Sequence, residues 1–134
     1  IRSPYSIRPY QHVLEPIFAY LLLAAEQTGH YEIAGCYNIG PDHNNCVTTL
    51  EIAEKFCDKW GGIQVEYVKA ETPHEAHFLR LDCSKIKSVL NWRPIWNIDE
   101  AVQRTVDLYR RIAEGAHVEN KIREQIAEYK ELMG

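Results

Sequence analysis

A short stretch near the start of the chain, residues 6–16, combines residue types that can hold an anion. Arg8 presents several N–H donors in a planar fork that matches phosphate or carboxylate. Pro9 has no N–H to donate and disfavours helical geometry at the residue before it, so Arg8 is predicted on an extended segment. A helix start follows at Glu15 and Pro16. The alternative is an edge strand whose arginine simply faces solvent, and the stretch by itself leaves both interpretations open.

A second candidate lies in the sequence His74-Glu75-Ala76-His77. Its two histidines are three residues apart behind Pro73, whereas a zinc-protease helix needs them four apart, so no metal site is predicted. Glu75 stands in a loop ahead of an extended segment, where a carboxylate can accept hydrogen bonds from the vicinal diol of a ribose. An ordinary exposed loop glutamate would give the same pattern.

The motifs that a complete active site needs are absent from the sequence. It has no glycine-rich dinucleotide loop, no phosphate-binding Walker loop and no Tyr-x-x-x-Lys pair. The four cysteines form no Cys-x-x-Cys pair and are predicted to be reduced, mostly buried thiols. No catalytic residue, no metal ligand and no cofactor-binding residue is therefore predicted within this chain.

Size and charge narrow the class of protein. A chain of 134 residues with 46% hydrophobic residues is suited to one globular domain. A net charge of −4 argues against nucleic-acid binding. The longest apolar run, residues 17–25, is too short to cross a bilayer, and no leader precedes it, so a soluble cytoplasmic protein without a membrane contact is expected. The first residue is not methionine, which suggests a fragment of a longer protein.

Hydrophobic periodicity predicts alternating strands and helices, and hence an α/β fold. A short opening strand carries Arg8. An almost wholly apolar buried helix is predicted at 14–28, and the helix at 48–60 can be capped by Thr48 or Thr49. The remaining predicted elements are strands or extended pieces at 31–39, 63–68 and 79–82, and helices at 84–90 and 98–113.

The last segment differs from the rest, because a narrow apolar stripe runs between dense charges. The stripe consists of Val118, Ile122, Ile126, Tyr129 and Met133. Glu119 and Arg123 form an i,i+4 pair that supports a helix. This amphipathic C-terminal helix is expected either to dock on its own domain or to contact a partner or another copy.

Five motifs occur in order along the chain, and together they resemble the C-terminal part of the CDP-glucose 4,6-dehydratase family. They are Arg8-Pro9-Tyr10-Gln11-His12-Val13-Leu14-Glu15-Pro16, Tyr37-Asn38-Ile39-Gly40-Pro41, His74-Glu75-Ala76, Leu81-Asp82-Cys83-Ser84-Lys85 and Leu90-Asn91-Trp92-Arg93-Pro94. The resemblance runs to about Ala113. It implies that residues 1–115 form the small substrate-binding lobe of an extended short-chain dehydrogenase/reductase, with few short strands and several helices, and that residues 116–134 are a helical appendage.

The resemblance also implies a function that this chain performs only in part. The family converts CDP-glucose to CDP-4-keto-6-deoxyglucose with NAD, and the NAD loop and catalytic pair lie in an N-terminal Rossmann domain that is absent here. By resemblance, Arg8 holds the substrate diphosphate and Glu75 accepts from the ribose. Thr72 stands where many relatives have a second phosphate-binding arginine, for which Arg80 or His74 could substitute. The predicted substrate-binding residues are Arg8, Tyr10, Gln11, His12, His74 and Glu75.

Two other functions remain open from the sequence. The parent could be a different nucleotide-sugar dehydratase or an epimerase, or the chain could be a non-catalytic α/β interaction module that recruits a partner through its C-terminal helix. If the parent is a nucleotide-sugar enzyme of either kind, the fragment alone is expected to be inactive and to bind no NAD. It is then also expected to self-associate through surface that the NAD-binding domain normally covers.

Overall fold

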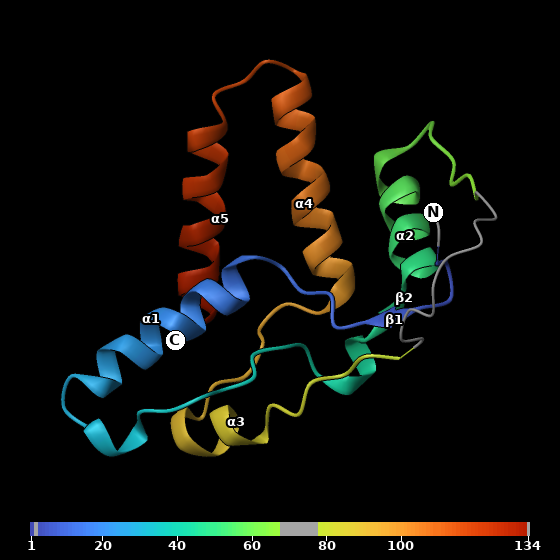
Figure 1. Cartoon of the computed structure of the whole chain (residues 1–134). Helices are drawn as coiled ribbons and strands as arrows, with labels where there is room; N and C mark the ends of the chain where they lie inside the picture. The colour runs from blue at the N-terminus through green and yellow to red at the C-terminus, as the bar shows by residue number, and fades with distance from the viewer. Residues whose placement is uncertain (2, 68–77, 134) are drawn as a thin grey trace.

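The computed structural model describes residues 1, 3–67 and 78–133. Three helices stand side by side in the upper part of Figure 1: α2 (Thr49–Trp60), α4 (Ile98–Ala113) and α5 (Val118–Leu132). Below them lie α1 (Leu14–Gln27), α3 (Ser84–Leu90) and extended connections with two 3₁₀ turns, η1 (Tyr31–Ile33) and η2 (His43–Asn45). α5 returns antiparallel to α4, and its C-terminal end reaches α1.

The sheet is small and contains the segment that carries Arg8. β1 (Ile7–Arg8) pairs antiparallel with β2 (Val47–Thr48), and Ile7 also forms a parallel bridge with Phe78. The described residues thus form a mostly helical α/β fold with five α-helices and a two-stranded sheet, which confirms the predicted fold class. The helices predicted at 84–90 and 98–113 occur with those bounds.

Two of the predicted strands are wrong. Residues 31–39 contain the turn η1 and then an extended stretch with no strand beside it among the described residues. Its carbonyls are met by side chains instead, since Lys85 Nζ donates to Cys36 O at 3.0 Å and Gln11 Nε2 to Ile39 O at 3.4 Å. Residues 63–67 are irregular, with Ile63 and Tyr67 exposed, because their alternating apolar side chains have no neighbouring layer to cover.

The core is divided between two clusters of buried side chains. One lies between α1 and α3 and is formed by Ala19, Cys83, Ile86 and Trp92. The other joins α2 to α4 through Ile98, Val102 and Val106, against which Tyr10, Phe56 and Trp60 pack. All four cysteines are free thiols, as predicted, but only Cys83 is buried, so the expectation of mostly buried thiols is wrong.

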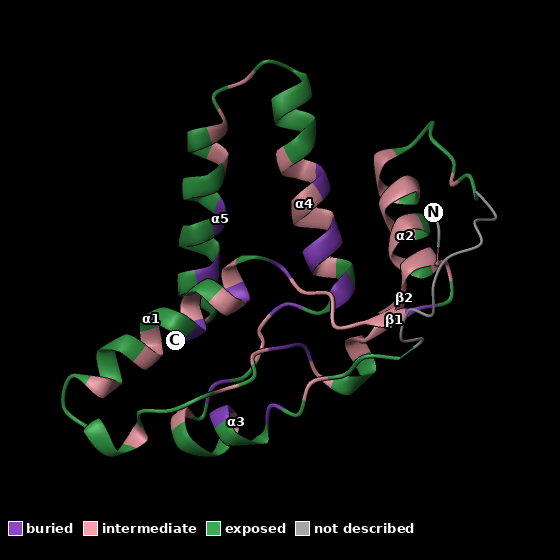
Figure 2. Ribbon diagram, in the orientation of Figure 1, coloured by how far each residue is buried: buried purple, intermediate pink, exposed green. Residues whose placement is uncertain are grey.

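α1 was predicted to be buried, and it is largely exposed. Its buried residues are Glu15 and Ala19, whereas Ile17, Tyr20 and Leu21 lie in solvent (Figure 2). An apolar groove of about 370 Å³ runs between α1 and the end of α5. Sequence shows that α1 is hydrophobic but not whether another element packs over it. No element in the described part of the chain covers Ile17, Tyr20 and Leu21 of α1. In that same part, no helix is both long and apolar enough to cross a membrane.

Capping residues set the starts of α2 and α4. Thr48 Oγ1 accepts from Glu51 N at 3.1 Å, while Glu51 Oε2 accepts from Thr48 N at 2.7 Å. Asn97 and Glu100 form the same reciprocal pair at α4. These bonds satisfy N–H groups that have no partner within the helix.

Replacing Thr48 by alanine is expected to lower the free energy of unfolding by about 1 kcal/mol, because an uncapped N–H remains at α2. Thr48→Ser keeps the acceptor and should retain most of the stability, and Glu54→Ala, on the exposed face of α2, serves as the matched control. Urea denaturation followed by circular dichroism measures all three. Equal stability of Thr48→Ala and Glu54→Ala would contradict the capping role.

Candidate functional site

The connection from β1 to α1 holds four of the six predicted substrate-binding residues. Arg8 is half-buried at the end of β1, and its Nη1 donates to Ile7 O at 2.9 Å. Tyr10 OH hydrogen-bonds Thr49 Oγ1 at 3.1 Å, and Thr49 Oγ1 also donates to Ser6 O at 3.2 Å. The start of α2 therefore fixes both sides of the segment that presents Arg8.

Gln11 lies at the wall of a small cavity of about 130 Å³ between this segment and the helices α2 and α4. Its Nε2 donates to Ile39 O at 3.4 Å. Its Oε1 is buried and has no hydrogen-bond partner among the described residues. A buried amide oxygen without a donor is costly, so this atom is suited to accept a hydrogen bond from water or from a ligand group.

His12 is packed inside the protein, with 7% of its surface exposed. Its ring meets Trp96 edge-on at 4.7 Å between centroids, and its Nδ1 accepts from Leu14 N at 3.3 Å. Burial, with a smaller contribution from the positive charge of Arg104, lowers the pKa of His12 from 6.5 to about 4. The imidazole is therefore neutral at pH 7, and its described contacts are those of a packing residue.

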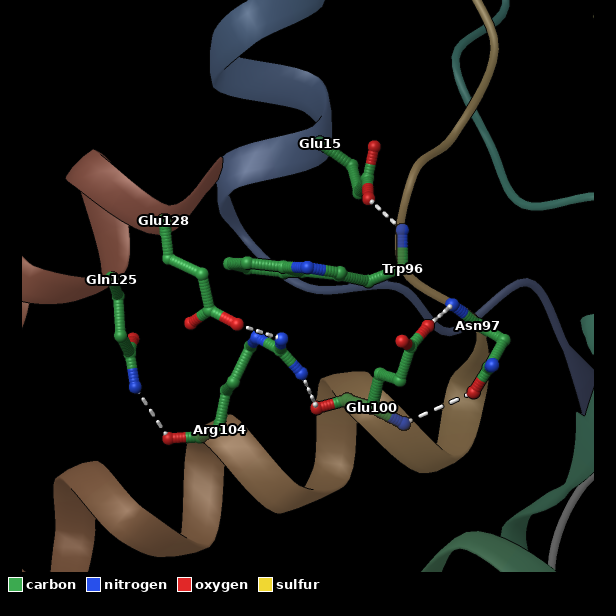
Figure 3. A network of polar contacts seen from close by, with 7 residues as sticks. All are labelled: Glu15, Trp96, Asn97, Glu100, Arg104, Gln125 and Glu128. Atoms are coloured by element: carbon green, nitrogen blue, oxygen red, sulfur yellow. Dashed lines mark hydrogen bonds and ion pairs between the residues drawn. The ribbon is translucent and has the colours of Figure 1, made fainter. Parts of the chain in front are cut away.

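Glu15 is fully buried at the first turn of α1. Its carboxylate accepts from Ile95 N at 3.0 Å, from Trp96 N at 2.8 Å and from Tyr129 OH at 2.6 Å. Burial and the hydrogen bond to Glu15 strongly raise the pKa of Tyr129. The hydroxyl therefore stays protonated and donates a hydrogen bond to the carboxylate. Three donors from distant parts of the chain thus converge on one side chain, as Figure 3 shows for the bond from Trp96.

The guanidinium of Arg104 lies over the ring of Trp96, 4.1 Å from the ring centroid. It forms an ion pair with Glu128, and Gln125 Nε2 donates to the Arg104 carbonyl at 2.8 Å (Figure 3). We refer to His12, Glu15, Trp96, Arg104 and Tyr129 as the Trp96 cluster. It connects the end of the candidate segment with α1, α4 and α5.

Arg80 lies two residues after Phe78, which forms an isolated parallel bridge with Ile7 of β1. The guanidinium of Arg80 stacks over the Phe78 ring at 4.6 Å.

His74, Glu75 and Thr72 lie outside the described residues, so their predicted roles stay predictions. Sequence reasoning missed the Trp96 cluster: it treated Glu15 as a helix start and Tyr129 as one member of an apolar stripe. The tyrosine hydroxyl in that stripe was the available signal, because a buried Tyr O–H usually needs an acceptor. Within the described residues no group of three His, Cys, Asp or Glu side chains is placed to hold a metal ion.

The fold and this segment define a small mostly helical α/β lobe with a cation at one strand end. No family model matches the chain. A curated relative, the CDP-glucose 4,6-dehydratase of Salmonella typhimurium (strain LT2), is 36% identical over 131 residues, which cover 96% of this chain and 36% of that protein. The predicted resemblance is confirmed: the chain is similar to part of a nucleotide-sugar dehydratase, and it spans well under half of that relative's length.

The buried neutral state of His12 predicts a pH dependence of stability. The unfolded chain binds a proton at His12 below about pH 6.5, whereas the folded chain does so only below about pH 4, so stability falls as pH decreases between these values. In His12→Asn, whose amide oxygen can replace Nδ1 as acceptor, the free energy of unfolding should fall less steeply across this range.

Urea unfolding at half-unit pH steps measures the slope. The matched control is His30→Asn, a change at an exposed side chain that leaves the burial of His12 intact. A slope in His12→Asn identical to that of the unmodified chain would show that His12 does not cause the pH dependence.

Proposed function

We propose that this chain is the substrate-binding part of a CDP-glucose 4,6-dehydratase and that it binds the CDP moiety of CDP-glucose. The observation that carries the proposal is the 36% identity, which extends over 96% of the chain rather than one motif. The substrate-binding lobe is proposed to comprise residues 1–115, with residues 116–134 as a helical appendage packed on it. A cytoplasmic location is part of the same proposal.

Arg8 is proposed as the contact to the diphosphate. It lies at the end of a strand held on one side by β2 and on the other by the bridge to Phe78, so its backbone is fixed before a ligand arrives. Holding a cation in place beforehand reduces the entropy lost on binding. Gln11 is proposed to accept from the ligand, and Tyr10 and His12 to shape the segment. Glu75 is proposed to accept from the ribose, and His74 to substitute for a second phosphate-binding arginine.

NAD is proposed to be held by the N-terminal domain of the parent enzyme, because the residues present here do not fit it. A dinucleotide site needs glycines that lead into a helix N-terminus. In the described residues, the glycines with left-handed backbone follow helix ends instead of leading into a helix: Gly61 and Gly62 come after α2, and Gly115 comes after α4. NAD accepts and returns a hydride in the parent reaction, and no step of that transfer is assigned to this chain.

The exposed apolar side chains of α1 support a further part of the proposal, contact with that N-terminal domain. Ile17, Tyr20 and Leu21 are each more than two-fifths exposed, on a helix that directly follows the candidate segment. Apolar surface of this kind is usually covered by another layer. Separated from the parent, the chain is expected to self-associate.

Replacing Arg8 by alanine in the full-length parent is expected to weaken binding of CDP by about 1.5–3 kcal/mol, as the loss of a charge-assisted contact should. Isothermal titration calorimetry measures the affinity. Arg93→Ala, at an exposed position after α3, is the matched control and should bind as the unmodified protein does. An unchanged affinity of a folded Arg8→Ala protein would remove Arg8 as the diphosphate contact.

Choice of nucleotide separates the proposed parent from other nucleotide-sugar enzymes. Titration of the full-length protein with CDP, UDP, GDP and dTDP is expected to give the tightest binding for CDP. Equal affinity for all four would remove the cytidine assignment while leaving the diphosphate contact in place. No binding of any of them would instead favour an interaction module.

A further inference from the structure

The C-terminal helix α5 makes one buried polar contact with the start of α1, through the hydroxyl of Tyr129. We propose that Tyr129 is a positioning residue for nucleotide binding: by holding Glu15 it fixes the segment of residues 8–12 in the geometry that presents Arg8. This inference rests on the proposed function and assigns to α5 a role in the site, although none of its residues is expected to touch the ligand.

Glu15 is tied directly to the candidate segment. Glu15 N donates to His12 O at 3.1 Å, and Leu14 N donates to His12 Nδ1 at 3.3 Å. The carboxylate that receives the Tyr129 hydroxyl therefore belongs to the same turn of chain as His12. A displacement of Glu15 would therefore move His12 through this hydrogen bond, and Arg8 through the four residues of backbone that join it to His12.

The ring of Tyr129 acts on the same residues from the side. It is 3% exposed and contacts Trp96 edge-on at 4.9 Å and Phe18 edge-on at 5.8 Å. Trp96 in turn packs against the ring of His12 at 4.7 Å. Hydroxyl and ring of Tyr129 thus reach the end of the segment by two separate routes, one polar and one through packed aromatic rings.

α5 is held firmly enough to serve as a support. Gln125 lies one turn before Tyr129 on α5 and donates to the Arg104 carbonyl, and Glu128 forms an ion pair with the Arg104 side chain on α4. α4 packs against α2 through the apolar cluster around Val102, with an ion pair between Lys55 and Asp99 at 2.8 Å beside it, and α2 also binds Tyr10 through Thr49. The segment is therefore supported at Tyr10 from α2 and at His12 from α5.

The alternative is that Tyr129 is a core residue whose loss merely lowers stability. The two roles differ in kinetics. A loosened Arg8 weakens binding of ground state and transition state alike, which raises KM and leaves kcat unchanged, because the reacting groups are on the other domain. A purely structural residue, in a protein that remains folded at the assay temperature, changes neither.

The test is Tyr129→Phe in the full-length parent, a change that removes one oxygen atom and keeps the ring. We expect KM for CDP-glucose and Kd for CDP to rise about fivefold, with kcat within about twofold of the unmodified enzyme. Tyr109→Phe, at a tyrosine on α4 that is 53% exposed, is the matched control and should change none of the three. Unchanged KM and Kd in a folded Tyr129→Phe enzyme would overturn the inference.

Hydrogen exchange of the ligand-free protein tests the positioning directly. In Tyr129→Phe the amides of Arg8, Tyr10, Gln11 and His12 should exchange faster, while those of α2 keep their rates. Equal acceleration throughout the chain would show a general loss of stability and overturn the inference. Should Tyr129→Phe fail to fold, Glu128→Gln removes the ion pair to Arg104 at the protein surface, and KM must then rise with kcat unchanged.

Arg8→Ala in the same binding assay separates failure of this inference from failure of the proposed function. If Arg8→Ala weakens CDP binding and Tyr129→Phe does not, the inference alone is wrong. If neither the unmodified protein nor any variant binds CDP, the proposed function is wrong. Faster exchange at residues 8–12 would in that case still establish that Tyr129 holds the segment.

Discussion

The buried carboxylate of Glu15 is the contact on which the rest of this structure depends. A carboxylate that loses its water must recover hydrogen bonds inside the protein, and each lost bond of this kind costs several kcal/mol. Glu15 recovers them from Ile95 N, Trp96 N and Tyr129 OH, which lie 80, 81 and 114 residues away along the chain. The requirement to satisfy one side chain thus fixes α1, the connection before α4, and α5 relative to one another.

The same contact explains how two separate apolar clusters form one fold. The cluster between α1 and α3 and the cluster between α2 and α4 share no member. The Trp96 cluster lies between them: Tyr129 packs on Phe18 beside the first, and Arg104 projects from α4, which builds the second. Its bonds are directional, so they set how the two halves are oriented, which apolar contacts alone would leave loosely determined.

Local patterns were sufficient for the helices and for the opening strand β1, and insufficient for the later strands and the site. Thr48 as a cap and the bounds of α3 and α4 follow from side-chain spacing, which acts within a few residues. Residues 31–39 have strand composition, but a strand exists only beside a partner, and the described chain provides none there. Arg8 was found from its sequence context, whereas the burial of Glu15 and its bond to Tyr129 depend on long-range contacts that periodicity does not contain.

α1 is hydrophobic by sequence and exposed in structure, because its N-terminal turn is enclosed while one side of the helix is left uncovered. At its N-terminal turn Glu15 and Ala19 are enclosed by the Trp96 cluster and the first core, whereas Tyr20 and Leu21 are each more than three-fifths exposed. A helix anchored at one end and uncovered along one side fits the proposed docking of an N-terminal domain, because the domain could cover α1 without shifting its start. The segment of residues 8–12 leads directly into that anchored end, so in the proposed site the docked domain would form the wall opposite Arg8.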